Sequence, residues 1–175
     1  EKAQALAKAF WPGPLTMVLP RSDIIPPEVS AGLDTVAVRY PVHPLAQALI
    51  MASKTPIAAP SANTSGKPSP TTAEHVMKDL SGKIDAVLDG GSCDVGLEST
   101  VITLCTDVPR LLRPGGITLS QLESVIGRVD VDEAVLNRLA EGKKAASPGM
   151  KYKHYSPAAR VVMIKGASDN YTCFV

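Results

Sequence analysis

Apolar residues recur at two different spacings along the chain, and the two spacings predict different elements. In the first ten positions, four apolar residues fall on one face of a helix: Ala3, Leu6, Ala7 and Phe10. Farther along, short apolar runs bounded by Gly, Pro and Asp are typical of strands. The pattern predicts strands at 15–19, 35–40, 57–59, 84–88, 100–104, 110–112 and 129–131, and helices at 1–10, 44–52, 72–80, 120–126 and 134–139.

The order of these elements indicates a fold class. Strands are mixed with helices, and the runs 100–104 and 110–112 are close enough along the chain to form a hairpin that turns at 107–109. Such a mixture favours the α/β (α+β) class, with a twisted mixed sheet and helices packed on it. The apolar rhythm weakens after residue 131 and restarts at 160–165, which indicates a core followed by a linker.

The stretch at 56–71, PIAAPSANTSGKPSPT, combines a short apolar run with a loop of small polar residues. Hydroxyl and amide side chains beside Gly and Pro form rigid loops, whose fixed donors suit phosphate or carboxylate oxygens. Thr71 followed by Glu74 has the spacing of a capping box, which predicts a helix start directly after the loop. The alternative interpretation is a long surface turn, which the composition alone favours equally.

Composition and charge exclude some classes of protein. With 175 residues, 45% of them hydrophobic, the chain has the size of one globular domain, or of one domain plus a fragment. Its 18 Lys and Arg against 17 Asp and Glu give a net charge of +1, which is no footprint of a general nucleic-acid binder. Cys93, Cys105 and Cys173 form no zinc motif and indicate free thiols in a reducing compartment. Since no apolar run could span a membrane and no signal peptide is recognisable, we expect a cytoplasmic protein.

Six short motifs occur in a fixed order. They are PGPLT at 12–16, VAVRYP at 36–41, PSANTSGKPSPT at 60–71, STVI at 99–102, RPG at 113–115 and KHYSP at 153–157. Together they resemble the threonylcarbamoyl-AMP synthase family, which has a YrdC-like core domain. The last motif, followed by a new strand, is similar to the longer two-domain members. The resemblance implies a synthase core at 1–131 without its N-terminal strands, a linker at 132–158, and the start of a Rossmann-like C-terminal domain at 159–175.

The resemblance implies a nucleotidyltransferase, an L-threonylcarbamoyladenylate synthase. Members of the family condense L-threonine, bicarbonate and ATP into threonylcarbamoyl-AMP and pyrophosphate, and a separate transferase passes the group to tRNA. Transfer at a phosphate mainly needs positioning and charge neutralisation, and Mg²⁺ is expected to accompany ATP with few protein ligands. The family's Thr-rich and Lys/Arg-rich motifs, which neutralise the triphosphate, have no match here, so we expect the 175-residue chain alone to be inactive.

The resemblance also implies roles for single residues, none of which is a covalent catalyst or a metal ligand. Arg39 is implied to hold the threonine carboxylate, because a guanidinium matches a carboxylate in a two-pronged contact. The alternative for Arg39 is a surface arginine on an edge strand. Ala59 and Ser99 are the other implied threonine contacts, with an ordinary strand alanine and a capping serine as the alternatives. The implied ATP contacts are Thr35, Ser61, Asn63, Ser69, Arg113, His154 and Tyr155.

These roles require one shared cavity. The polar loop should face the same space as Arg39 and Arg113, and a placement of the two arginines on opposite sides of the sheet would contradict the assignment. His43 and His75 are isolated and are expected to be surface or capping residues. Two other classes stay open: an RNA-binding YrdC-like module without catalysis, which would contact tRNA directly, and the carbamoyl-transfer domain of a hydrogenase-maturation protein.

Overall fold

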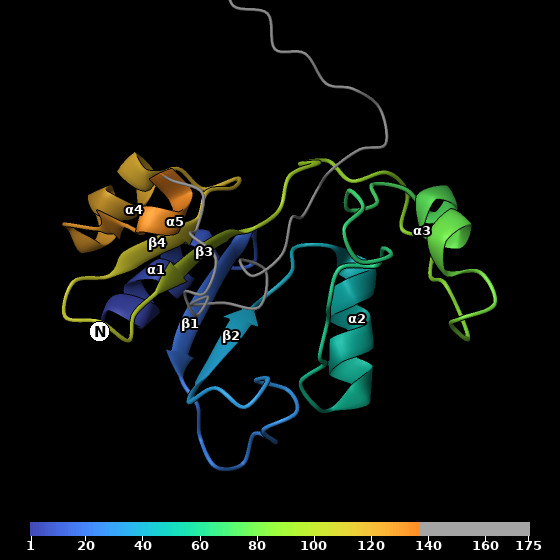
Figure 1. Cartoon of the computed structure of the whole chain (residues 1–175), viewed down its shortest axis with the longest axis horizontal. Helices are drawn as coiled ribbons and strands as arrows, with labels where there is room; N and C mark the ends of the chain where they lie inside the picture. Colours follow the sequence, from blue (N-terminus) through green and yellow to red (C-terminus); the bar gives the residue numbers. More distant parts are fainter. Residues whose placement is uncertain (137–175) are drawn as a thin grey trace, which may run out of the picture.

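The computed structural model describes residues 1–136, in which a five-stranded mixed sheet carries helices on one face (Figure 1). The strands are β1 (Leu15–Pro20), β2 (Thr35–Arg39), β3 (Thr100–Thr103), β4 (Arg110–Arg113) and β5 (Asp130–Val131). The helices are α1 (Lys2–Phe10), α2 (Pro44–Ser53), α3 (Ala73–Leu80), α4 (Leu119–Ile126) and α5 (Glu133–Leu136). This architecture confirms the predicted α/β class with a mixed sheet.

The strands lie in the order β2-β1-β3-β4-β5. β1 is antiparallel to β2 and parallel to β3, while β4 is antiparallel to β3 and parallel to β5. The β3–β4 pair is the predicted hairpin, with an irregularity in register between Val101 and Ile102. Segments far apart in the sequence, 15–18 and 100–103, are thus neighbours in the middle of the sheet.

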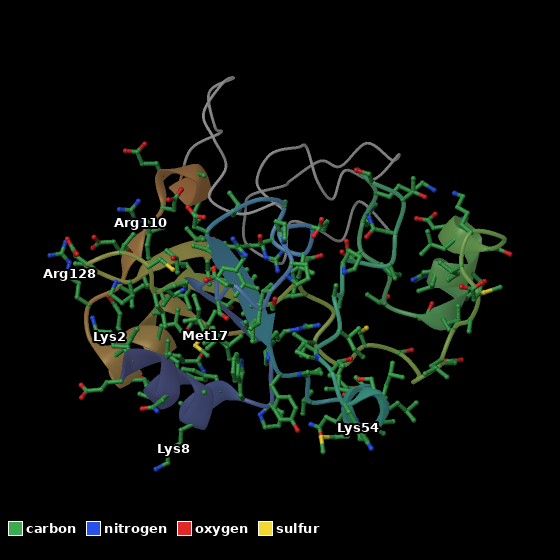
Figure 2. The ribbon with its side chains drawn as sticks, turned by 90° about the horizontal axis from the view of Figure 1, so that it is seen from below. Lys2, Lys8, Met17, Lys54, Arg110 and Arg128 are labelled. Atoms are coloured by element: carbon green, nitrogen blue, oxygen red, sulfur yellow. The ribbon has the colours of Figure 1, made fainter. Side chains whose placement is uncertain are left out.

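The main core lies between one face of the sheet and helices α1 and α4. Leu6 of α1 and Leu122 of α4 are fully buried against Leu15, Met17 and Ile102 of the central strands. The predicted helical face of α1 explains this packing, because residues three and four apart share one side of a helix. Figure 2 shows Met17 in the interior of this layer, with Lys2 and Lys8 of α1 at its outer side.

The opposite face of the sheet holds a smaller apolar cluster. It consists of Val18, Val101 and Leu112, one residue from each of the strands β1, β3 and β4. Successive side chains of a strand point to opposite faces, so Leu15 and Met17 face the helices while Thr16 and Val18 face away from them. The candidate site described below lies on this second face.

Three helices begin at polar side chains that accept a hydrogen bond from the first turn. Thr118 is the cap of α4 and forms a capping box with Gln121. His43 caps α2 through Nδ1, which confirms its expected role. The predicted capping box at Thr71 is wrong by one residue, because Thr72 has the extended backbone of a cap and accepts from the backbone N–H of His75.

Two predicted strands, 57–59 and 84–88, are not formed. Ile57, Ile84 and Leu88 have exposed fractions of 44%, 41% and 67%. An apolar run indicates that a segment tends to be buried, but a strand also needs a neighbouring strand for its backbone hydrogen bonds. None of the strands in residues 1–136 pairs with these two runs. Figure 1 shows α2 and α3 beyond the β2 edge of the sheet, apart from α1, α4 and α5. Within the described part of the chain, no helix is long and apolar enough to cross a membrane.

Candidate functional site

Four strands contribute residues to one row across the sheet. Thr16 of β1 lies opposite Arg39 of β2 and beside Val101 of β3, which in turn lies opposite Arg113 of β4. Directly paired residues point to the same face of a sheet. Arg39 therefore lies on the face that carries Thr16 and Val18. The side chain of Arg113 reaches the same face, because its Nη2 donates to Ser99 Oγ, which lies 2.7 Å from Thr16 Oγ1. A shared face is what the predicted cavity requires. With two strands between Arg39 and Arg113, their backbones are about 14 Å apart at the usual strand spacing.

Arg113 is held firmly by Ser99. Its Nε and Nη2 donate to the Ser99 carbonyl oxygen at 3.1 and 2.9 Å, and Nη2 also reaches Ser99 Oγ at 3.1 Å. Ser99 is buried, and its Oγ lies 2.7 Å from Thr16 Oγ1. The structure thus joins a predicted ATP contact and a predicted threonine contact directly. Thr16 was missed as a member of this cluster, although it is the last residue of the PGPLT motif.

Gly115 fixes the distance between the RPG and STVI motifs. A Cβ atom at this position would clash with the backbone at Glu98, Ser99 and Thr100. All three clashing atoms belong to the main chain, so no side-chain rotation would relieve the contact. The glycine therefore lets the chain after Arg113 pass close to Ser99.

The polar loop is organised around the turn Thr64–Lys67. Asn63 Nδ2 donates to the carbonyl oxygens of Thr64 and Lys67 at 2.9 and 3.0 Å. Asp79 of α3 accepts from the Thr64 backbone N–H at 3.1 Å and from Lys67 Nζ at 2.6 Å. These bonds hold the turn from two sides and tie the loop to α3.

Asp79 was not predicted from the sequence. The hydrogen bond from Lys67, and after it the bond from the Thr64 N–H, hold the pKa of its carboxyl below the ordinary value of 3.8. Its partners lie 12 and 15 residues earlier in the chain, and no local sequence motif predicts a contact over such a separation. Only the folded arrangement of loop and helix reveals it.

Two polar atoms of the loop are buried without a hydrogen-bond partner in residues 1–136: Asn63 Oδ1 and Ser69 Oγ. Both contacts of Asn63 Nδ2 are carbonyl oxygens, which can only accept, so the orientation of this amide is fixed. Buried polar atoms without partners are rare because they lose their bonds to water. The two atoms are therefore candidates for contact with a polar ligand.

The other predicted site residues are more scattered. Thr35 lies at the opposite end of β2 from Arg39, about 13 Å away at the usual rise per residue. Ala59 and Ser61 are exposed and lie outside helices and strands. No hydrogen bond or ion pair within residues 1–136 joins the polar loop to Arg39, so the single shared cavity stays a prediction. His154 and Tyr155 lie outside the described residues.

Residues 1–136 contain no group of three or more His, Cys, Asp or Glu residues that could hold a metal ion. The sequence predicted that Mg²⁺ would be carried by the phosphates of ATP rather than by a protein cluster. That expectation stays a prediction.

Comparison with sequence families matches residues 1–115 to the Sua5/YciO/YrdC family, which carries the description "Telomere recombination". Residues 117–173 match a second family, described as "Threonylcarbamoyl-AMP synthase, C-terminal domain". The linker and domain boundaries predicted from the sequence stay predictions.

Among curated proteins, the threonylcarbamoyl-AMP synthase of Pyrococcus abyssi is 54% identical over 169 residues. That of Bacillus subtilis is 54% identical over 170 residues. Both alignments cover 97% of this chain, but 49% and 48% of the relatives. The chain therefore spans about half the length of the curated relatives it matches.

Solved structures show the same similarity. The crystal structure of P. abyssi Sua5 complexed with L-threonine has a TM-score of 0.90 and 53% identity, over 97% of this chain and 49% of that chain. The structure of E. coli YciO has a TM-score of 0.59 and 25% identity, over 68% of this chain and 58% of that chain.

Proposed function

Because the chain belongs to the Sua5/YciO/YrdC family, we propose that the protein carrying it is an L-threonylcarbamoyladenylate synthase. The observation that carries this proposal is the 54% identity, over 97% of the chain, to curated enzymes named threonylcarbamoyl-AMP synthase. The substrates would be L-threonine, bicarbonate and ATP, and the products threonylcarbamoyl-AMP, pyrophosphate and the water that is lost when the threonine amine combines with bicarbonate. A separate transferase would then carry the group to tRNA.

The reaction places few chemical demands on the protein. An oxygen of N-carboxylated threonine attacks the α-phosphorus of ATP, and the bond to the β-phosphate oxygen breaks, so that pyrophosphate leaves with the electron pair. Such a transfer needs fixed positive charge and alignment rather than a protein nucleophile. The arginines that share one face of the sheet fit this demand.

On the threonine side, Arg39 is the proposed carboxylate ligand. Its side chain is exposed at the end of β2, on the same face as Thr16 and Ser99. A related Sua5 protein has been crystallised with L-threonine, which supports threonine as the amino-acid substrate. Ala59 is proposed as a further wall of the threonine pocket.

On the nucleotide side, Arg113 is the proposed phosphate ligand. Its three bonds to Ser99 fix the guanidinium before any ligand arrives, and preorganised charge stabilises a transition state more than mobile charge does. The unpartnered Asn63 Oδ1 and Ser69 Oγ support a polar ligand at the loop. Thr35, Ser61, His154 and Tyr155 complete the proposed ATP contacts, with Mg²⁺ bound mainly by the phosphates.

The proposal is tested with the full-length protein. Purified enzyme is incubated with ATP, L-threonine, bicarbonate and Mg²⁺, pyrophosphate release is followed, and threonylcarbamoyl-AMP is identified by mass spectrometry. We expect product only when all three substrates are present. Pyrophosphate release that does not depend on threonine or bicarbonate would contradict the proposed reaction.

The same assay tests the 175-residue chain by itself, which spans about half the length of its relatives. We expect no turnover from it, because a triphosphate needs more positive charge than Arg113 supplies. Comparable rates from the short chain and the full-length protein would show that residues 1–175 contain the whole site.

A further inference from the structure

Two side chains hold the turn Thr64–Lys67 by hydrogen bonds to the same two residues. One side chain binds donor groups of Thr64 and Lys67, and the other binds their carbonyl oxygens. The Asp79 carboxylate accepts hydrogen bonds from the backbone N–H of Thr64 and from the ammonium of Lys67. The side-chain amide of Asn63 donates hydrogen bonds to the carbonyl oxygens of Thr64 and Lys67. The turn therefore lies between a carboxylate of α3 and the side-chain amide of Asn63. A backbone bond from Lys67 N to Thr64 O, at 3.1 Å, closes the turn itself.

We propose that Asp79 is a positioning residue for the nucleotide, acting through this turn on Asn63. The inference rests on the proposed function, in which Asn63 contacts ATP. With the turn fixed by Asp79, both carbonyl partners of Asn63 Nδ2 are fixed, and Asn63 Oδ1 is held in one direction. Without the Asp79 carboxylate, neither the turn nor the Asn63 amide would be held in place relative to α3 by these hydrogen bonds.

The geometry distinguishes this contact from an ordinary surface ion pair, which contributes little. One of the two bonds to Asp79 comes from a backbone N–H, so it fixes the main chain of the loop and not merely a flexible side chain. The carboxylate side chain is only 11% exposed, although that of Lys67 is 55% exposed. Lys83 Nζ donates to the Asp79 carbonyl oxygen at 3.2 Å, which adds a contact at the end of the helix.

The ammonium of Lys67 contributes to the network, but it is the weaker half. Removing it leaves the bond from Thr64 N–H to the carboxylate intact, whereas removing the carboxylate breaks both bonds at once. The inference therefore predicts an order of effects: Asp79→Ala should disturb the nucleotide more than Lys67→Met does.

The experiment measures KM for ATP and KM for threonine in the full-length enzyme, by pyrophosphate release. For Asp79→Ala we expect the KM for ATP to rise about ten- to a hundredfold, because small misplacements of a binding group have effects of this size. The KM for threonine should stay within about twofold, since Arg39 and Ser99 lie on other elements. Lys67→Met should raise the KM for ATP by less than Asp79→Ala.

Glu74→Gln is the matched control, because Glu74 is a carboxylate of the same helix without a hydrogen bond to the loop within residues 1–136. It should leave both KM values unchanged. An Asp79→Ala enzyme with an unchanged KM for ATP would overturn the inference, as would equal increases for ATP and threonine, which would indicate a general loss of structure. A wild-type enzyme that makes no threonylcarbamoyl-AMP would instead contradict the proposed function.

Discussion

The two arginines of the candidate site are held very differently. Arg113 is half-buried and makes three bonds to Ser99, so its removal would disturb both the fold and any bound phosphate. The side chain of Arg39 is exposed and makes no hydrogen bond or ion pair with another residue of 1–136. A substitution at Arg39 therefore isolates ligand binding from stability better than one at Arg113.

We predict that Arg39→Ala in the full-length protein weakens threonine binding far more than ATP binding. Losing a charged hydrogen-bonded contact should cost about 1.5–3 kcal/mol, which is roughly ten- to a hundredfold in affinity. Calorimetric titration with each substrate measures both effects. Arg39→Lys is the control, because it keeps the charge but not the two-pronged geometry, and it should restore only part of the affinity. Equal losses for threonine and ATP would count against the assigned role.

A second prediction concerns the charge of Asp79. Its pKa is lowered in the folded state by Lys67 and by the Thr64 N–H. A lowered carboxyl pKa contributes stability above the unfolded value, here 3.8, and that contribution disappears as the pH falls through the folded value. Wild type should therefore be more stable than Asp79→Asn at neutral pH, and the difference should shrink below about pH 4.

Thermal melting of both proteins between pH 7 and pH 3 checks this prediction. Because the Lys67 ammonium is 55% exposed, added salt should reduce the difference at neutral pH. A difference in melting temperature that stays constant down to pH 3 would show that the carboxylate charge is not the cause.

At the level of elements, contacts between motifs depend on small residues as much as on charged ones. Gly115 brings the chain after β4 against the residues that precede β3, and this contact lies beside the Arg113–Ser99 bonds. The glycine is needed for space, and not for an unusual backbone angle. A side chain at this position would therefore have to displace the neighbouring main chain.

We predict that Gly115→Ala lowers the free energy of unfolding by about 1–3 kcal/mol, the usual range for overpacking. The new methyl group would meet main-chain atoms of Glu98, Ser99 and Thr100, which cannot rotate away. Gly116→Ala is the control, because its nearest contact would be the Pro14 ring at 3.1 Å, and it should cost less. Urea denaturation of both variants gives the comparison, and equal effects would contradict the steric explanation.

The accuracy of the sequence-based predictions also differs between elements. The predictions of β1, β3 and β4 were correct because these apolar runs are both buried and paired in the structure. The runs at 57–59 and 84–88 are also largely apolar but lack partners within residues 1–136, and pairing cannot be read from composition. Motif resemblance predicted roles for Ser99 and Arg113, which the structure joins by hydrogen bonds, and the roles stay predictions. Asp79 was not predicted because its contacts join separate parts of the chain.

At the level of the whole molecule, burial is unevenly distributed. The buried hydrophobic residues of the described part lie in two stretches of the chain: Leu6, Leu15, Met17 and Val18, and then Val101, Ile102, Leu111, Leu112, Leu122 and Val129. Between them, residues 31–98 include α2 and α3, neither of which has a buried residue. Figure 1 shows these two helices apart from the layer of α1 and α4. The molecule therefore combines a half that has a buried apolar core with a half, residues 31–98, in which no hydrophobic side chain is buried.

The last prediction follows from this difference and concerns native-state hydrogen exchange of the 175-residue chain. Amides of β1 and β3 should exchange only through global unfolding, which typically requires about 5–15 kcal/mol. Amides of α2 and α3 should exchange through local opening at far lower free energy, because few buried apolar contacts oppose it. Exchange followed by mass spectrometry of proteolytic fragments separates the two groups. Within residues 31–98, Asp79→Ala should speed exchange at 63–67 and leave β1 and β3 unchanged, since Asp79 bonds to Thr64 and Lys67 and not to these strands. Uniform protection across the sheet, α2 and α3 would show that the two halves open as one cooperative unit.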